Sequence, residues 1–282
     1  MKPASFAYHR ATDIEHTLDL LAQLAPEGGR ILAGGQSLVP LMALRLAQPA
    51  HLIDINRVSF GTMRVEEEFL CVPASARHAD LGAAPGALGQ VLARVARHIA
   101  HLPIRSRGTF CGSLAHADPS AEWPLVFATL GGEAVARSAG GERRVGADGF
   151  VLDIMTTALA ESEVLTEVRL AMPTPAVRMG FYEVSRRAGD YAMAMAFVTV
   201  ALDRGAVIEA RVGVGAAERR PRRIAAAEAV LLGATWCDGV IERAADAAAS
   251  AIDPMEDLQV SAAFRRDLVR SSVRRALRSA VA

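Results

Sequence analysis

Apolar and polar residues recur along the chain with two different periods, which predicts both helices and strands. Between residues 12 and 25 the apolar positions recur every three or four residues, so we expect a helix capped by Thr12 or Asp13. Short apolar runs at 30–33 and 52–55 are typical of buried strands. A hairpin is predicted across three successive glutamates, with strands at 63–65 and 69–72. Helices are further expected at 78–81, 87–101 and 121–130, and strands at 133–138 and 163–170.

The stretch Met-Pro-Thr-Pro at 172–175 is the best candidate for a linker, because proline interrupts both helices and strand ladders. Beyond it, strand-like runs separated by short polar turns predict a three-stranded antiparallel sheet, at 181–186, 193–202 and 207–214. Helices are then expected at 224–232, 239–251 and 262–280. Because neither half shows regular βαβ alternation, the fold class is predicted to be α+β.

The composition is that of a folded globular protein without a general affinity for polyanions. Of 282 residues, 51% are hydrophobic and 22% charged, which is sufficient for a core and excludes disordered classes. The 31 basic residues equal the 31 acidic ones, so we expect no nucleic acid or anionic membrane as partner. The longest apolar run, 191–202, is far shorter than the roughly 18 residues that span a bilayer. Without a signal-like apolar segment at the start, a cytoplasmic protein is expected.

Several kinds of chemistry are excluded by residues that are rare or scattered. Lys2 is the only lysine, so the chain has neither a phosphate-binding P-loop lysine nor an internal lysine for a Schiff base. Cys71, Cys111 and Cys237 lie far apart and form no C-x-x-C pair, so we expect no zinc site or iron–sulfur cluster of this chain. We assign no metal ligands and no catalytic residues.

Two loops combine glycine with hydroxyl side chains. The first, Leu-Ala-Gly-Gly-Gln-Ser-Leu-Val-Pro at 32–40, joins a predicted strand to a probable helix. The second spans 105–119, where an arginine pair precedes Gly-Thr-Phe-Cys-Gly-Ser. Glycine permits positive φ angles and close approach of the backbone, so two such loops that converge can offer N–H and O–H groups to a pyrophosphate. We therefore expect a dinucleotide ligand.

Simpler interpretations of single residues stay open. The paired glycines of the first loop can be a plain turn with Ser37 as a helix cap. Asp118, which precedes a proline, is typical of an N-cap rather than of a metal ligand. His98 and His101 have the i, i+3 spacing of two ligands on one helix, but a solvated or hydrogen-bonded pair is more common.

Two further features also have a simple and a functional interpretation. The arginines of the last predicted helix are typical of a solvated face, with partner docking as the alternative: Arg265, Arg266, Arg270, Arg274, Arg275 and Arg278. Cys111 lies near His116 in sequence, so a reactive thiol is a minor alternative to a structural residue.

Beyond these local patterns, the chain resembles a known family over nearly its whole length. Residues 33–46 and 52–55 are similar to the first signature of the FAD-binding medium subunit of molybdenum hydroxylases, and residues 104–119 are similar to the second. The resemblance continues in order through 157–166 and 185–192. The family includes the carbon monoxide dehydrogenase medium subunit and the FAD domain of xanthine dehydrogenase.

The resemblance implies a two-subdomain FAD-binding domain of the vanillyl-alcohol-oxidase (PCMH) type at 1–172, with a break near 56–62. A smaller α+β C-terminal domain at 178–282 would follow. FAD would lie extended between the subdomains, with its pyrophosphate in the two glycine loops and its isoalloxazine near Glu122, Leu165 and Tyr191. The implied FAD-binding residues are Leu32, Ala33, Gly34, Gly35, Gln36, Ser37, Leu38, Thr109, Cys111, Gly112, Ser113, Asp118, Glu122, Leu165 and Tyr191.

Two positions depart from the family pattern. Cys111 stands where glycine is usual, and Glu122 is followed by tryptophan where a smaller apolar residue is common. A Cβ and a sulfur atom in the phosphate loop are expected to narrow the pocket or shift the backbone.

The function implied is that of an electron-transfer subunit in a multi-subunit molybdenum hydroxylase. FAD would pass electrons from two-iron, two-sulfur clusters of a small subunit to an external acceptor, while a large subunit with the molybdenum cofactor oxidises the substrate. A dimer of heterotrimers is expected. The alternative is a self-sufficient FAD-dependent oxidoreductase, which would need its own base above the flavin.

Overall fold

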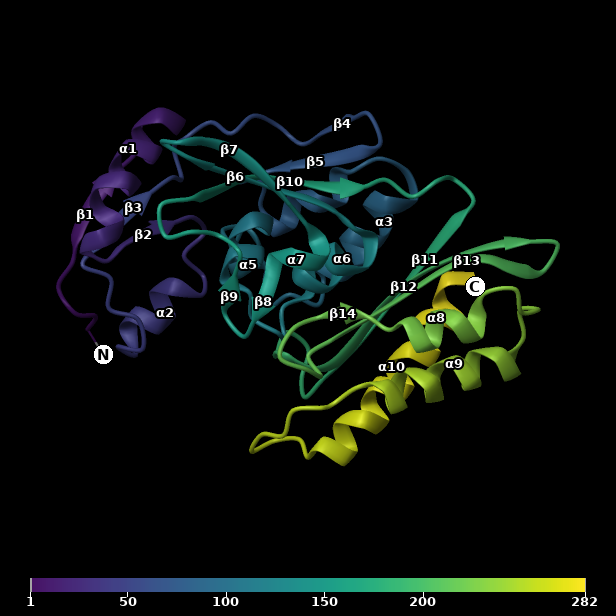
Figure 1. Ribbon diagram of the computed structural model, residues 1–282. Helices are drawn as coiled ribbons and strands as arrows, with labels where there is room; N and C mark the ends of the chain where they lie inside the picture. The colour runs from purple at the N-terminus through teal and green to yellow at the C-terminus, as the bar shows by residue number, and fades with distance from the viewer. Residues whose placement is uncertain (1, 282) are drawn as a thin grey trace.

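The computed structural model describes residues 2–281, and its first part is a three-stranded parallel sheet (Figure 1). The strand order is β1–β3–β2, with both outer strands parallel to β3. The predicted helix is confirmed, because Asp13 Oδ1 caps it by accepting the His16 N–H at 2.8 Å. The elements of this part are β1 (Ala7–Arg10), α1 (Ile14–Leu24), the 3₁₀ helix η1 (Ala25–Glu27), β2 (Gly29–Leu32), α2 (Leu38–Ala43) and β3 (His51–Asp54).

The second part is a five-stranded antiparallel sheet with the order β4–β5–β10–β6–β7. Its strands are β4 (Arg64–Glu66), β5 (Phe69–Pro73), β6 (Gly132–Ser138), β7 (Gly141–Gly146) and β10 (Val164–Ala171). The predicted hairpin is confirmed as the β4–β5 pair. Between β5 and β10 the chain forms η2 (His78–Ala83), α3 (Gly86–Ala96), α4 (Leu102–Arg105), α5 (Phe110–His116), α6 (Glu122–Leu130), α7 (Ala147–Phe150), β8 (Val151–Asp153) and β9 (Thr156–Thr157), as well as β6 and β7.

The third part is a four-stranded antiparallel sheet with helices on one face, as Figure 1 shows. Its elements are β11 (Val177–Ser185), β12 (Ala192–Asp203), β13 (Ala206–Gly215), β14 (Arg222–Arg223), α8 (Ala225–Leu231), α9 (Asp238–Ala251) and α10 (Ala262–Val281). Strand β12 is buried on both faces: Phe197 packs in the core shared with the second part, and Val198 packs in the core under α8–α10.

Helix α6 joins the second and third parts. Its side chains are buried nearly all round, among them Trp123 and Phe127, because it packs against β10 on one side and β12 and β13 on the other. Gly213 on β13 makes this approach possible, since a Cβ there would lie 1.8 Å from Thr129 Oγ1. The second part and the C-terminal helices are therefore joined by continuous packing through α6, β12 and β13.

The α+β class is confirmed, and two element predictions are corrected. The C-terminal sheet has four strands rather than three, because the two arginines of β14 pair with β13 although they are too few and too polar to show in the pattern. The helix expected at 87–101 ends at Ala96, where i→i+3 hydrogen bonds tighten the chain before Ala100 turns at φ +39°. The domain limits at 1–172 and 178–282 and the break near 56–62 stay predictions.

Candidate functional site

The first glycine loop, residues 33–37, is held by its carbonyl oxygens. The carbonyls of Gly35 and Ser37 accept hydrogen bonds from N–H groups inside α2, at 3.0 and 3.1 Å, and Gln36 Nε2 donates to Gly34 O at 2.9 Å. Gly35 has φ +73°, a left-handed conformation that favours glycine. Ser37 stands at the N-cap position of α2, but its hydroxyl makes no capping hydrogen bond, so the simple cap interpretation is wrong. Because these carbonyl oxygens already accept hydrogen bonds, the backbone N–H groups of the loop are the groups suited to an anion.

Asn56 and Arg77 connect the two loops, and neither residue is part of the motifs predicted from the sequence. Asn56 Nδ2 donates to Ala33 O at 2.7 Å, and Asn56 Oδ1 accepts from Arg77 at 2.9 Å. Arg77 also donates to Arg107 O in the second loop. Asp54 orients Asn56 by accepting its backbone N–H at 2.8 Å. The Asp-Ile-Asn sequence, which begins with the last residue of β3, was the available signal for this anchor.

The structure places the two loops in direct backbone contact. A Cβ on Gly34 would lie 2.3 Å from Arg107 O and 2.6 Å from Gly108 Cα. A Cβ on Gly112 would lie 3.6 Å from the Cβ of Ala33. Gly34 and Arg107, which are 73 residues apart in sequence, are thus neighbours in space. The two loops together form one surface of glycine backbone and small side chains.

Within the second loop, residues 110–116 form the short helix α5. Thr109 caps it, because its Oγ1 accepts the Gly112 N–H at 3.0 Å. The backbone before the helix is fixed by hydrogen bonds from Phe110 N to Ala76 O and from His78 N to Gly108 O, both 3.0 Å. Ser113, one turn into α5, is half-buried.

Cys111 does not project into the phosphate loop, so the expected narrowing of the pocket is wrong. Its side chain is 2% exposed and lies in the core, where Sγ donates to Val72 O at 3.5 Å. Burial raises the pKa of the Cys111 thiol well above its usual range. A helical residue can direct its side chain into the core while its backbone stays at the surface of the loop, and Cys111 does so. The reactive-thiol alternative is wrong for the same reason.

Replacing Cys111 is expected to affect stability rather than ligand binding. Cys111→Gly removes a buried side chain and places glycine in a helix, so the free energy of unfolding should fall by about 2 kcal/mol. Cys111→Ala, which keeps helix propensity, should cost about half as much. Urea unfolding of both variants measures this difference. Unchanged stability in Cys111→Gly would contradict the core position of the thiol.

The residues implied to lie near a flavin ring come from four different segments. Asp118 follows α5, and its Oδ1 accepts the Ser120 N–H at 2.8 Å, whereas the N-cap of the next helix is Ala121. Partial desolvation, followed by the charges of Asp118 and Glu122, raises the pKa of Tyr191. Leu165 is buried in β10, opposite Ala136.

His78 supports the second loop from behind. Its Nδ1 accepts a 2.8 Å hydrogen bond from Trp123 Nε1, and a Cβ on Gly108 would lie 2.5 Å from its Nε2. Burial, followed by the positive charges of Arg77 and Arg105, lowers the pKa of His78 to about 4. The imidazole is therefore a neutral structural group at neutral pH, and the family motif around residues 104–119 does not include it.

The neutral state of His78 predicts loss of stability in acid. An unfolded histidine protonates near pH 6.5, whereas this residue resists protonation down to about pH 4, so stability is present above pH 6.5 and is lost between these values. The expected loss is about 3 kcal/mol, at roughly 1.4 kcal/mol per pKa unit. Urea unfolding at pH 7 and pH 4.5 should show a smaller difference for His78→Gln, whereas the exposed His101→Gln should behave as the unmodified protein.

The other candidate ligands found in the sequence do not form a metal site. Within residues 2–281 no group of three or more His, Cys, Asp and Glu side chains could hold a metal ion. His98 and His101 both lie beyond the end of α3, so they do not share a helix face. In the same range no helix is both long and apolar enough to cross a membrane.

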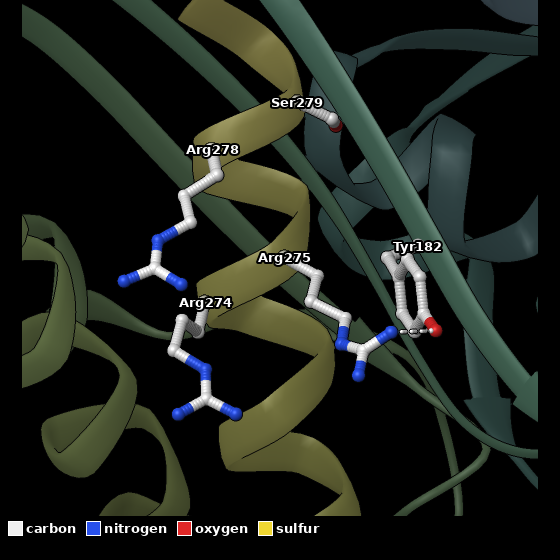
Figure 2. Close-up of a pocket in the computed structure, with 5 residues that line it drawn as sticks. All are labelled: Tyr182, Arg274, Arg275, Arg278 and Ser279. Carbon is white, nitrogen blue, oxygen red and sulfur yellow. Dashed lines mark hydrogen bonds between the residues drawn. The ribbon is translucent and has the colours of Figure 1, made fainter. Parts of the chain in front are cut away.

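The arginines of α10 are not a uniformly solvated face. Arg265 is 4% exposed and donates to Ala216 O at 3.0 Å, and Arg270 pairs with Asp246 on α9 at 2.7 Å. A hollow of about 520 Å³ lies beside α10. Its lining residues, drawn in Figure 2, are Tyr182, Arg274, Arg275, Arg278 and Ser279. Arg275 donates to the hydroxyl of Tyr182 at 2.6 Å across it. No residue of the glycine loops lines this hollow, so it is separate from the candidate site.

Comparison with known proteins finds two family matches that follow each other along the chain. Residues 4–173 match the family described as the FAD binding domain in molybdopterin dehydrogenase. Residues 180–280 match the CO dehydrogenase flavoprotein C-terminal domain. The nicotine 6-hydroxylase medium subunit of Paenarthrobacter nicotinovorans is 36% identical over 98% of this chain and 98% of its own length.

Solved structures show the same fold. A chain of carbon monoxide dehydrogenase from Hydrogenophaga pseudoflava superposes with a TM-score of 0.94 at 35% identity, over 100% of this chain and 99% of that one. A chain of quinoline 2-oxidoreductase from Pseudomonas putida 86 gives a TM-score of 0.94 at 33% identity, with the same coverage. With two family matches in order and relatives aligned end to end, this chain belongs to the FAD-binding medium-subunit family of the molybdenum hydroxylases.

Proposed function

We propose that this chain binds FAD and serves as the electron-transfer subunit of a multi-subunit molybdenum hydroxylase. The observation that carries the proposal is the backbone contact between the two glycine loops at Gly34 and Arg107, which joins both signature motifs in one site. The medium-subunit relatives favour this function over a self-sufficient oxidoreductase.

The donor set of the loops fits the pyrophosphate of FAD. Carbonyl oxygens of the first loop are engaged by α2, Gln36 and Asn56, so the backbone N–H groups of 33–38 are the groups left to face a ligand. A pyrophosphate is anionic and accepts several hydrogen bonds, and small residues allow it to come close to the backbone. The residues proposed to hold it are Leu32, Ala33, Gly34, Gly35, Gln36, Ser37, Leu38, Thr109, Cys111, Gly112 and Ser113, with Cys111 acting through its backbone.

The isoalloxazine end is proposed to lie near Asp118, Glu122, Leu165 and Tyr191. Leu165 would offer apolar contact from β10, and Tyr191, which is 70% exposed, would cover the ring from the β11–β12 turn. Once bound, FAD would supply the redox chemistry, taking electrons from a reduced partner and passing them to an acceptor. The residues of this chain would hold and orient the cofactor and determine the electrostatic potential around it.

The partners proposed are a large subunit with the molybdenum cofactor and a small subunit with two-iron, two-sulfur clusters, in a cytoplasmic dimer of heterotrimers. Relatives named as the medium chain of carbon monoxide dehydrogenase and as subunit alpha of a 6-hydroxypseudooxynicotine dehydrogenase complex support a multi-subunit assembly. We also propose that residues 1–172 form the FAD-binding domain, with its subdomains meeting near 56–62, and that 178–282 form the C-terminal domain.

FAD binding by the purified full chain tests the proposal. Titration of apo-protein with FAD should quench flavin fluorescence to a stoichiometry of one, and FMN, which lacks the pyrophosphate, should bind much more weakly. Copurification with the tagged chain should recover two further polypeptides together with molybdenum and iron. Equal affinity for FAD and FMN would contradict the pyrophosphate assignment, and a chain that carries FAD but recovers no partners would contradict the subunit assignment.

A further inference from the structure

A chain of hydrogen bonds runs from strand β1 to the second glycine loop, and Asp54 lies at its centre. Asp54 is half-buried at the end of β3, and one of its carboxylate oxygens, Oδ2, accepts a hydrogen bond from the hydroxyl of Tyr8 on β1. The other oxygen, Oδ1, accepts from the backbone N–H of Asn56 at 2.8 Å and from Asn56 Nδ2 at 2.6 Å. The carboxylate therefore connects the first strand of the sheet to the residue that holds the first loop.

The contacts of Asn56 require one orientation of its side-chain amide. Nδ2 has two hydrogens, and it donates to Asp54 Oδ1 and, at 2.7 Å, to Ala33 O, while Oδ1 accepts from Arg77 at 2.9 Å. With the amide turned over, its oxygen would face two acceptors and its NH₂ group would face a donor. Asp54 thus favours the orientation in which Asn56 bonds both Ala33 and Arg77.

The chain of hydrogen bonds ends at the contact between the two glycine loops. Ala33 directly precedes Gly34. Arg77 donates to Arg107 O, which is the same carbonyl oxygen that a Cβ on Gly34 would meet at 2.3 Å. Arg77 also forms an isolated β-bridge with Thr109, the cap of α5. Asn56 and Arg77 therefore span the place where the loops approach each other most closely.

Asp54 is ionised in the folded chain at neutral pH. Partial burial alone would raise the pKa of Asp54, but the hydrogen bonds from Tyr8 and Asn56, followed by the charge of Arg10, lower it below its ordinary value. Arg10 lies opposite Asp54 in the β1–β3 register, and its guanidinium lies 5.8 Å from the centre of the Tyr8 ring. The mostly exposed strand β1 thus supplies both a hydrogen-bond donor and a positive charge to this carboxylate.

Hydrogen bonds to an ionised acceptor are shorter and stronger than those between neutral groups, so a carboxylate holds the Asn56 amide more firmly than a neutral residue would. We propose that Asp54 is a positioning residue for the two phosphate loops, and that it sets their separation through Asn56 and Arg77. Its effect on the second loop is indirect, because its side chain bonds Tyr8 and Asn56 whereas Arg77 bonds the loop. The consequence for FAD rests on the proposed function, whereas the effect on the loops does not.

Hydrogen exchange of the full apo-chain, followed by mass spectrometry, tests this connection without a cofactor. In Asp54→Ala, Asn56 loses the acceptor of two hydrogen bonds, so exchange should become at least about threefold faster at residues 105–109 as well as at 33–38. Asp54→Asn keeps an acceptor for Asn56 and should exchange as the unmodified protein does. Unchanged exchange at 105–109 in folded Asp54→Ala, or exchange in Asp54→Asn as fast as in Asp54→Ala, overturns the proposal.

Asp13→Ala is the matched control for a loss of stability alone. Asp13 also accepts a backbone N–H, from His16 at 2.8 Å, and it lies in the same part of the molecule, but it caps α1. This variant should unfold at a lower urea concentration and leave exchange at 105–109 unchanged. Exchange at 105–109 that is accelerated equally in Asp13→Ala would indicate general loosening of the fold and overturn the proposal.

Fluorescence titration with FAD tests whether Asp54 acts through Asn56. Asp54→Ala and Asn56→Ala should each weaken FAD binding by about tenfold. The double variant should bind FAD no more weakly than Asn56→Ala alone, because Asp54 has no route to the second loop once the Asn56 side chain is removed. Losses that multiply in the double variant, or full FAD affinity in folded Asp54→Ala, overturn the positioning role of Asp54.

The two measurements separate this inference from the proposed function. Exchange in the apo-chain reports on the loops alone. A chain that binds no FAD, but in which Asp54→Ala accelerates exchange at 105–109, would overturn the proposed function and leave the connection between Asp54 and the loops standing. Tight FAD binding by the unmodified protein, together with unchanged exchange in Asp54→Ala, would support the proposed function and overturn this inference.

Discussion

Gly34→Ala is expected to weaken FAD binding by at least about 100-fold. The new Cβ would lie 2.3 Å from Arg107 O and 2.6 Å from Gly108 Cα, and both are backbone atoms that cannot rotate away. The loops must therefore separate, which strains the backbone and misaligns charge-assisted hydrogen bonds to the pyrophosphate. We expect the free energy of FAD binding to weaken by about 3 kcal/mol or more. Fluorescence titration of apo-protein with FAD measures the loss.

Gly146→Ala is the matched control for this experiment. Gly146 has φ −64°, and a Cβ there would meet no atom within 4 Å, so this substitution should leave both folding and FAD affinity unchanged. Circular dichroism establishes whether each variant is folded. FAD affinity equal to that of the unmodified protein in folded Gly34→Ala would remove the convergence of the two loops as the basis of binding.

The elements that the sequence predicted are those in which one short segment carries its own signal. Helix α1 shows an apolar period of three to four residues and an aspartate cap, and the β4–β5 hairpin turns at three consecutive glutamates. Elements that depend on distant partners were missed. Strand β1 is mostly exposed and exists because it pairs with β3, and β14 is two arginines that pair with β13.

The sequence singled out the two glycine loops that the structure brings into contact, but not the residues that support them. Glycines and hydroxyls at 33–37 and 108–113 were visible because their residue types suit a phosphate. Asn56, Arg77 and His78 were not, since their role is to hold carbonyls and ring nitrogens that come together only in the folded chain. Cys111 was misjudged because a sequence does not say which way a helical side chain points.

The isolated chain loaded with FAD is expected to remain oxidised when mixed anaerobically with the substrate of its complex. The residues proposed for the site hold and orient the cofactor, and the imidazole of His78, which supports the second loop, is neutral and bonded to Trp123. Direct oxidation of an organic substrate would need a base placed above the flavin. Stopped-flow absorbance at the flavin band should therefore stay constant with this chain alone.

Adding the cluster-bearing subunits should raise the rate of flavin reduction by orders of magnitude. In the assembled complex the flavin absorbance should bleach within one turnover, because electrons then reach this chain through the iron–sulfur clusters of the partner. Substrate with the molybdenum subunit but without the iron–sulfur subunit is the matched control, and it should leave the absorbance unchanged. Rapid anaerobic bleaching of this chain alone by a small organic substrate would contradict the subunit function and favour a self-sufficient oxidoreductase.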